Sequence, residues 1–303
     1  MAGNEFIDPS RALHAVLDEA HSSYTERDLV LYALAVGAGR DPVDLTDLHL
    51  VYENHPDGFR PLGTYAVVPA INAYMTLAAE GRNAPGLDFG LDRVLHGEQS
   101  LELLRPLPPA ASLRHRLSIA AIWDKGKHAV VVTHVDTFEA RTGELLCRNE
   151  LSTLVKGAGD FGGERGPHGE VNMPPSRPPD AVVTEATLPQ QALLYRLTGD
   201  WNPLHADPGF AQLFGFERPI LHGLCTWGFA ARAAIATGAG GDPRTLRRFQ
   251  ARFAGSVFPG ETLRTELWRE SATRLILRTT ALERQVPVLT NAAVEFDPAF
   301  SSR

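Results

Sequence analysis

Residues 195–206 read YRLTGDWNPLHA, and the run 221–237, LHGLCTWGFAARAAIAT, follows them after a short extended segment. The longer run is mostly apolar and stops before Gly238, and glycine is the commonest residue just past a helix end. Its many glycine and alanine residues would let a sheet wrap closely around its backbone. The C-terminal half of the chain is therefore predicted to be organised around one long central helix.

The shorter stretch carries an acid and an imidazole. Asp200 and His205 lie five positions apart, after Gly199, which ends a helical pattern, and on either side of Pro203, which cannot continue a helix. The pair is therefore predicted to lie on an irregular loop that can direct both side chains into one cleft. A carboxylate beside a histidine suits general acid and base catalysis, because imidazole titrates near neutrality. Asn202 adds a neutral hydrogen-bonding group between them.

A purely structural interpretation of these residues is also open. Asp200 or Asn202 could cap a backbone amide, and His205 could be a core histidine with satisfied hydrogen bonds. The next segment favours chemistry, because residues 219–224, PILHGL, lead into the apolar helix. Backbone amides at a helix N-terminus stabilise negative charge, so an oxyanion hole is predicted there.

Length and composition limit the class of protein. A chain of 303 residues can form two modest domains or one large one, and 44% hydrophobic with 21% charged residues is ordinary for a globular protein. A net charge of −7 argues against nucleic acid as the main partner, although a cluster such as Arg247, Arg248 and Arg252 could still bind an anion. Cys147 and Cys225 lie far apart, so we expect no disulfide, metal site or cofactor.

The chain shows no sign of export or membrane insertion. Its first residues lack the basic and apolar regions of a secretory signal, and no apolar run approaches the roughly 20 residues that span a bilayer. The final residues, 301–303, are not a recognisable peroxisomal address, and two cysteines in a chain of this size fit a reducing compartment. We therefore expect a cytoplasmic protein without a membrane partner.

The order of the predicted elements repeats once along the chain. Residues 157–180 hold six glycines and five prolines and read as a connection between two halves, since no Walker pattern supports a phosphate-binding loop there. The expected division is 1–161, 162–181 and 182–303. Helices are predicted at 25–36, 187–197 and 221–237, with a short helix after Asp207, and strands at 112–123, 127–139, 143–156, 246–257, 261–270, 273–283 and 286–296.

The two halves share short motifs but differ in one important distance. Leu-His-Gly occurs at 95–97 and again at 221–223, and a turn proline follows the histidine by 37 positions in the second copy but by only 13 in the first. The first copy is therefore predicted to lack room for a long central helix. It also lacks counterparts of Asp200 and His205, so we expect it to bind a long apolar substrate.

At this point the sequence resembles a known family. GDWNPLH at 199–205, followed by ILHG at 220–223, resembles the signature of the hydratase 2 group of MaoC-like proteins. PLGTYAVVP at 61–69 and VLHGEQ at 94–99 are similar to the hydratase unit of the peroxisomal type 2 multifunctional enzymes. The resemblance implies an α+β double hot-dog fold, with two antiparallel sheets each wrapped around a helix, a reduced N-terminal helix and assembly as a homodimer.

The resemblance also implies an activity. It predicts a hydro-lyase that reversibly hydrates trans-2-enoyl-CoA to (3R)-3-hydroxyacyl-CoA without a metal or cofactor, through a water activated by Asp200 and His205. Asn202 matches the same catalytic loop, and the Gly223 amide matches the donor to the thioester oxygen. The other residues expected to contact the acyl-CoA substrate are His96, Gly97, Lys125, Trp201, Pro203, Leu204, Arg252 and Phe253.

Several alternatives stay open at this stage. Lys125 and Arg252 could bind CoA phosphates or be solvated surface charges, His96 could satisfy local backbone groups, and Phe253 could be a core residue. Asp160 departs from the family, which more often has glycine there. A dehydratase acting on acyl-carrier-protein substrates would use the same two catalytic residues, and a hot-dog thioesterase or an inactive acyl-CoA-binding protein are further alternatives.

Overall fold

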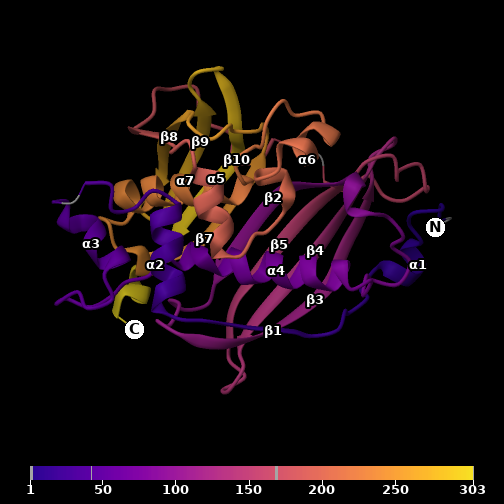
Figure 1. The fold of residues 1–303 in the computed structure, drawn as a ribbon, viewed down its shortest axis with the longest axis horizontal. Helices are drawn as coiled ribbons and strands as arrows, with labels where there is room; N and C mark the ends of the chain where they lie inside the picture. Colours follow the sequence, from indigo (N-terminus) through magenta and orange to yellow (C-terminus); the bar gives the residue numbers. More distant parts are fainter. Residues whose placement is uncertain (1–2, 42, 168–169, 303) are drawn as a thin grey trace.

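The computed structural model describes residues 3–41, 43–167 and 170–302, which form one ten-stranded antiparallel sheet with the main helices packed on one face (Figure 1). The strands are β1 (Ala20–Tyr24), β2 (Val94–Leu103), β3 (Ala111–Asp124), β4 (Ala129–Glu139), β5 (Leu145–Val155), β6 (Ala181–Ala186), β7 (Leu246–Phe253), β8 (Thr262–Ser271), β9 (Arg274–Ala281) and β10 (Val286–Phe296).

The helices are mostly short. The α-helices are α1 (Pro9–Ala12), α2 (Glu26–Ala35), α3 (Leu45–Val51), α4 (Val67–Ala79), α5 (Gln191–Tyr195), α6 (Pro208–Leu213) and α7 (Gly223–Gly238). The 3-10 helices are η1 (Gly63–Ala66), η2 (Leu91–Arg93), η3 (Arg196–Thr198), η4 (Pro203–His205), η5 (Pro243–Thr245) and η6 (Pro298–Ser302). No helix of the described chain combines the length and the hydropathy needed to cross a membrane.

The second half of the sheet repeats the strand order of the first half in reverse. The order is β1-β3-β4-β5-β2-β7-β10-β9-β8-β6, so β2 and β7 meet at the centre and β1 and β6 form the two edges. The central pair is antiparallel, with residues 98–102 of β2 opposite residues 248–252 of β7. Two five-stranded units are thus joined edge to edge, and a site between them can draw residues from both halves of the chain.

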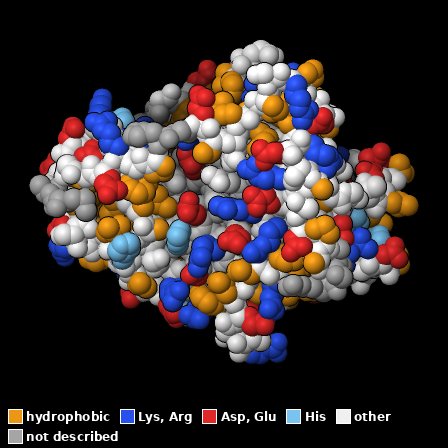
Figure 2. Space-filling view, turned by 180° about the vertical axis from the view of Figure 1, so that it is seen from behind, with side chains coloured by type: hydrophobic (Ala, Val, Ile, Leu, Met, Phe, Trp, Pro, Cys, Tyr) orange, Lys and Arg blue, Asp and Glu red, His pale blue; other side chains and the backbone are white. Residues whose placement is uncertain are grey.

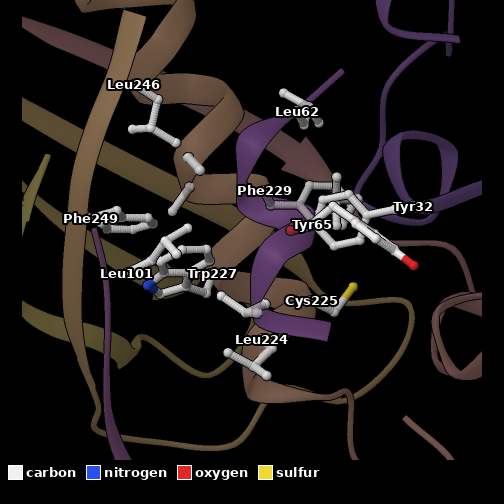
Figure 3. Packing of buried hydrophobic residues seen from close by; sticks show 14 of the residues in the cluster. Tyr32, Leu62, Tyr65, Leu101, Leu224, Cys225, Trp227, Phe229, Leu246 and Phe249 are labelled. Carbon is white, nitrogen blue, oxygen red and sulfur yellow. The ribbon is translucent and has the colours of Figure 1, made fainter. Parts of the chain in front are cut away.

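Helix α7 is the central helix of the second unit, as predicted. Its Trp227 stacks on Phe249 of β7 with ring centroids 4.2 Å apart, and both side chains lie in the main core beside Leu101 of β2 (Figure 3). A methyl group on Gly228 would come within 2.5 Å of Val36 Cγ1. The small residues of α7 therefore admit α2 of the first half, and not only the surrounding sheet.

The first unit has a central helix of its own. Helix α4 has 13 residues against 16 in α7, and its Ala73 and Leu77 pack against Leu117, Val135 and Leu151 on β3, β4 and β5. The double hot-dog fold is therefore confirmed, and the first helix is the shorter of the two. The expectation that the first half has no room for a long helix was wrong, because α4 lies before β2.

The two Leu-His-Gly motifs are consequently not structural equivalents. Residues 95–97 lie within strand β2, whereas residues 221–223 lead into helix α7. The spacing from histidine to the next turn proline therefore spans a strand in the first half and a helix in the second, so the two spacings are not comparable. The segment 48–69 contains the end of α3, all of η1 and the start of α4.

Most of the other element predictions are confirmed. The seven predicted strands correspond to β3, β4, β5, β7, β8, β9 and β10, and the helix predicted at 25–36 is α2, which begins with a capping box of Thr25 and Asp28. The helix expected from residue 187 begins only at Gln191, because the Thr187 hydroxyl donates to the Glu261 carbonyl at 2.8 Å and does not cap a helix. The edge strands β1 and β6 and the central strand β2 were not predicted.

The connection between the two units is partly bound to the first unit. Its described residues form no helix or strand, but Phe161 is buried, and the Asp124 carboxylate accepts hydrogen bonds from the amides of Asp160 and Gly162 at 3.0 and 2.9 Å. Asp160 has φ of 59°, a conformation that favours glycine. The division of the chain at residues 161 and 181 stays a prediction.

The face of the sheet turned away from the helices is covered with charged side chains of both signs (Figure 2). Ion pairs link neighbouring strands there: Arg252 of β7 lies 2.8 Å from Glu98 of β2, and Arg148 of β5 lies 2.7 Å from Asp136 of β4. The helix-covered face is the one that builds an apolar interior, and the candidate site lies on that side.

Candidate active site

The loop that carries the acid and the imidazole is shaped by its own sequence. Gly199 ends η3 with φ of 134°, a backbone conformation that side chains strongly disfavour. The Asn202 side chain then accepts a hydrogen bond from the Leu204 amide at 3.0 Å and so caps η4, which begins at Pro203. His205 is the last residue of that short helix, so the expected irregular loop is present.

A cavity of about 410 Å³ lies between the two units, beside this loop. Strand β2 and helix α4 of the first unit form part of its wall, and the catalytic loop, α7 and β7 of the second unit form the rest. The lining includes Ile71, Tyr74, Met75, His96, Gly97, Leu151, Thr153, Asp200, Asn202, Leu204, His205, Gly223, Thr226 and Phe253. The wall is mostly apolar, so the few polar groups that face the cavity stand out.

Asp200 and His205 perturb each other inside this cavity. Burial raises the pKa of Asp200, and the neighbouring His205 opposes that shift. Burial likewise lowers the pKa of His205, which Asp200 opposes. Both shifts favour the uncharged forms, a protonated carboxyl beside a neutral imidazole. One group can then give a proton while the other takes one.

The hydrogen bonds of His205 define which ring nitrogen is available. Its Nδ1 lies 2.8 Å from the carbonyl oxygen of Ile220, and a carbonyl can only accept. Nδ1 therefore carries the proton, and Nε2 of the neutral ring is the free acceptor. The ring is 9% exposed, so it contacts the cavity without being open to bulk solvent.

Gly223 supplies the positive end of a helix to the same cavity. It is the first residue of α7 and is solvent-exposed where it lines the cavity. A methyl group at this position would lie 2.9 Å from Cδ1 of Phe253, so only glycine fits without displacing that ring. The amides of the first helical turn, together with the helix dipole, can stabilise an oxygen that gains negative charge.

Comparison with known proteins identifies the family to which this arrangement belongs. Residues 22–157 match the MFE-2 hydratase 2 N-terminal domain, and residues 170–292 match the MaoC like domain. The chain is 44% identical over 284 residues to enoyl-CoA hydratase 2, peroxisomal, of Arabidopsis thaliana, with 90% of each chain covered. The chain belongs to the MaoC-like hydratase 2 family. As a member of this family it is a hydro-lyase.

Two further relatives of this MaoC-like protein differ in length. The chain is 42% identical over 313 residues, 98% of its own length, to peroxisomal multifunctional enzyme type 2 of Mus musculus, and it spans 41% of that protein. The crystal structure of a MaoC-like dehydratase from Phytophthora capsici matches with a TM-score of 0.87 and 28% identity, covering 98% of this chain and all of the other (100%). The family fold therefore extends over both units.

Some of the substrate contacts expected from the family resemblance lie at the cavity. His96, Gly97, Leu204 and Phe253 line it together with the catalytic loop. The His96 ring meets Phe253 edge to face at 4.9 Å, and burial lowers the pKa of His96 to about 4. Nε2 of His96 is buried and has no hydrogen-bond partner among the described residues.

Four expected contacts lie elsewhere. Lys125 donates from Nζ to the carbonyl oxygen of Arg165, Arg252 is paired with Glu98, and neither residue lines the cavity. Pro203 is exposed beside the cavity, and Trp201 is 56% exposed with the Arg196 guanidinium stacked 4.6 Å from its ring. The placement of Lys125 and Arg252 agrees with the alternative of surface charges that are already partnered.

Two groups of lining or supporting residues were missed. Ile71, Tyr74 and Met75 belong to α4, whose apolar spacing from residue 67 onwards could have predicted a helix. His222 was not among the residues expected at the site, yet its ring stacks on His205 with centroids 3.7 Å apart. Only the assembled structure shows these contacts.

Asp200, His205 and His222 also form a cluster of possible metal ligands, with one donor atom of each within 4.8 Å of the others. The two imidazole rings are stacked with centroids 3.7 Å apart and an angle of 29° between their planes, so lone pairs that lie in these two planes do not converge well on a common ion. The cluster is therefore better arranged for proton transfer than for chelation.

Proposed function

We propose that this protein catalyses the reversible hydration of trans-2-enoyl-CoA to (3R)-3-hydroxyacyl-CoA. The observation that carries the proposal is the placement of an acid, a base and a helix N-terminus on one cavity wall, at Asp200, His205 and Gly223. The name of the Arabidopsis relative, enoyl-CoA hydratase 2, supports the same substrate class. The activity requires no metal or cofactor.

In the proposed mechanism a water molecule binds between the dyad residues, Asp200 and His205. Nε2 of His205 accepts one proton of the water as its oxygen forms a bond to C3. Protonated Asp200 delivers its proton to C2, and the thioester oxygen gains negative charge that the Gly223 amide stabilises. A donor of this kind typically contributes about 3 kcal/mol. Transfer of the proton from His205 to Asp200 restores the starting state.

The first unit is proposed to bind the acyl chain. Helix α4 contributes an apolar part of the cavity wall, made by Ile71, Tyr74 and Met75. Among the lining residues these are the most distant in sequence from the catalytic loop. Residues 1–161 would thus act as the binding repeat and 182–303 as the catalytic repeat. Assembly as a homodimer and a cytoplasmic location also remain proposals.

The test is hydration of enoyl-CoA thioesters of increasing length, followed as the loss of absorbance of the conjugated double bond, with chiral analysis of the product. Asp200→Asn should abolish turnover of crotonyl-CoA while the protein stays folded, because the amide cannot donate an acidic proton. Full activity of this variant would overturn the assignment of the dyad. Release of free thiol would indicate a thioesterase, and a preference for the carrier-protein thioester of the same acyl group would indicate the dehydratase alternative.

A further inference from the structure

One histidine outside the cavity contacts both members of the dyad. We propose that His222 is a positioning residue that holds Asp200 and His205 in their catalytic geometry, an inference that rests on the proposed hydration mechanism. His222 is 1% exposed and does not line the cavity. It therefore acts on the reaction through its neighbours and not on the substrate.

The first contact of His222 fixes the acid. Its Nε2 lies 3.1 Å from the backbone carbonyl oxygen of Asp200, and because a carbonyl only accepts, Nε2 must carry the proton. Asp200 follows Gly199, whose φ of 134° is a conformation that residues other than glycine rarely adopt. A second hydrogen bond, from the Asn202 amide to Oδ1 of Asp200, is long at 3.4 Å. The bond from His222 is the shorter of the two and comes from outside the loop.

The second contact fixes the base. The rings of His222 and His205 are stacked with centroids 3.7 Å apart and an angle of 29° between their planes. His205 is held along its edge by the Ile220 carbonyl, two residues before His222. The edge contact sets the direction of Nε2, and the stacked ring prevents the imidazole from tilting about that hydrogen bond.

The residues that supply these contacts belong to one anchored segment, 220–223. The Leu221 amide donates to the Val257 carbonyl at 2.7 Å, and the Tyr195 ring lies 4.8 Å from His222. The segment ends in Gly223, which opens α7 at the cavity. Four consecutive residues of the chain thus position the acid, the base and the helix amides.

Two substitutions separate the two contacts of His222. His222→Phe keeps a ring of similar size for stacking but removes the N–H that holds Asp200. His222→Gln places an amide nitrogen near the position of Nε2 and so can keep the bond to Asp200, although it loses the ring. Since a misplacement of 1 Å can cost about 100-fold in rate, His222→Phe should lower kcat about 100-fold.

The experiment measures kcat and KM for crotonyl-CoA hydration at a known concentration of folded protein. KM should change less than about threefold in both variants, because His222 does not touch the cavity. The kcat of His222→Gln should be at least about tenfold higher than that of His222→Phe. The matched control is His115→Phe, since His115 is also fully buried but is bonded to Ser22 and Thr137, away from the cavity. That control should lower the Tm and leave kcat per folded molecule unchanged.

Two outcomes would overturn the inference: wild-type kcat in folded His222→Phe, or an equal loss of kcat in His222→Phe and His115→Phe. Asp200→Asn is measured beside them to separate the two proposals. Loss of activity in Asp200→Asn with full activity in His222→Phe would reject the role of His222 alone. Full activity in Asp200→Asn would reject the proposed mechanism itself.

Discussion

His205 donates from Nδ1 to the carbonyl oxygen of Ile220 at 2.8 Å, and this hydrogen bond leaves Nε2 as the only nitrogen that can take a proton. A substitution can separate the hydrogen bond made by Nδ1 from the proton acceptance at Nε2. His205→Asn places an amide nitrogen near Nδ1 and can keep the bond to Ile220, but it has no counterpart of Nε2. We expect kcat for enoyl-CoA hydration to fall about 100-fold or more, with little change in Tm.

The comparison variant for this prediction is His205→Leu. It should lose the same activity and also several degrees of Tm, because the Ile220 carbonyl then has no donor from the side chain at position 205. If His205→Asn hydrates crotonyl-CoA at the wild-type rate, the base has been assigned to the wrong residue.

The Phe253 ring lies directly against Gly223 and leaves no room for a side chain there. In Gly223→Ala the new methyl group would lie 2.9 Å from Cδ1 of Phe253, so the N-terminus of α7 or the ring must move. We expect kcat to fall about 10- to 100-fold as the amide is displaced. The double variant Gly223→Ala with Phe253→Leu makes room for the methyl group and should recover part of that loss. A fully active Gly223→Ala would show that the amide is not needed.

Asp200 should make the protein less stable as the pH rises. Its pKa is raised in the folded state by burial, so both states are protonated at low pH, and the unfolded state ionises first. The contribution of Asp200 to the free energy of unfolding therefore falls above about pH 4 and reaches its lowest value above the folded pKa. The gain in Tm of Asp200→Asn over the wild type should be near zero at pH 4 and larger at pH 8.

The control for this pH dependence is Asp180→Asn, because the hydrogen bond from Arg177 lowers the pKa of Asp180 in the folded state. Between pH 4 and pH 8 the difference in Tm of Asp180→Asn from the wild type should change in the opposite direction. A stability gain in Asp200→Asn that is constant between pH 4 and pH 8 would contradict the raised pKa.

Arg232 of α7 connects the two halves of the fold. It lies 3.0 Å from Asp47 of α3 and 2.9 Å from Glu185 of β6, and its side chain is only 14% exposed. Arg232→Met leaves two partly buried carboxylates without a counterion, so we expect a loss of about 2–4 kcal/mol in the free energy of unfolding. Adding Asp47→Asn and Glu185→Gln should restore most of it.

Arg82 offers the matched control for Arg232, because it also pairs with two carboxylates but is 40% exposed. Arg82→Met should cost less than about 1 kcal/mol. Equal losses from the two variants, measured by urea unfolding, would show that the burial of the Arg232 network adds nothing.

Met75 should influence the length of the acyl chain that binds. It lines the cavity from α4, and a larger side chain there would shorten the space left for the chain. For Met75→Trp we expect KM for a ten-carbon enoyl-CoA to rise about tenfold and KM for crotonyl-CoA to stay near the wild-type value. Ala79→Trp, at the exposed end of the same helix, is the control. Equal changes for both substrates would place the acyl chain elsewhere.

Much of the catalytic half was determined by short-range sequence features. The capped loop of Asn202 and Pro203 and the helix from 223 follow from residues within a few positions of one another, and the strands follow from alternating apolar residues. The signature 199–205 predicted the family, which the comparisons show. Capping and periodicity are local, so these parts can be read from the chain itself.

The rest was decided only when β2 and β7 paired and brought residues about 150 positions apart together. That pairing put Met75 of α4 into the same wall as Gly223, and it left Arg252 bound to Glu98 on the opposite face. The contacts of His222 depend on where the loop of Asp200 folds back against it. A cavity wall is built by long-range contacts, and neither composition nor local spacing predicts which distant side chains will meet there.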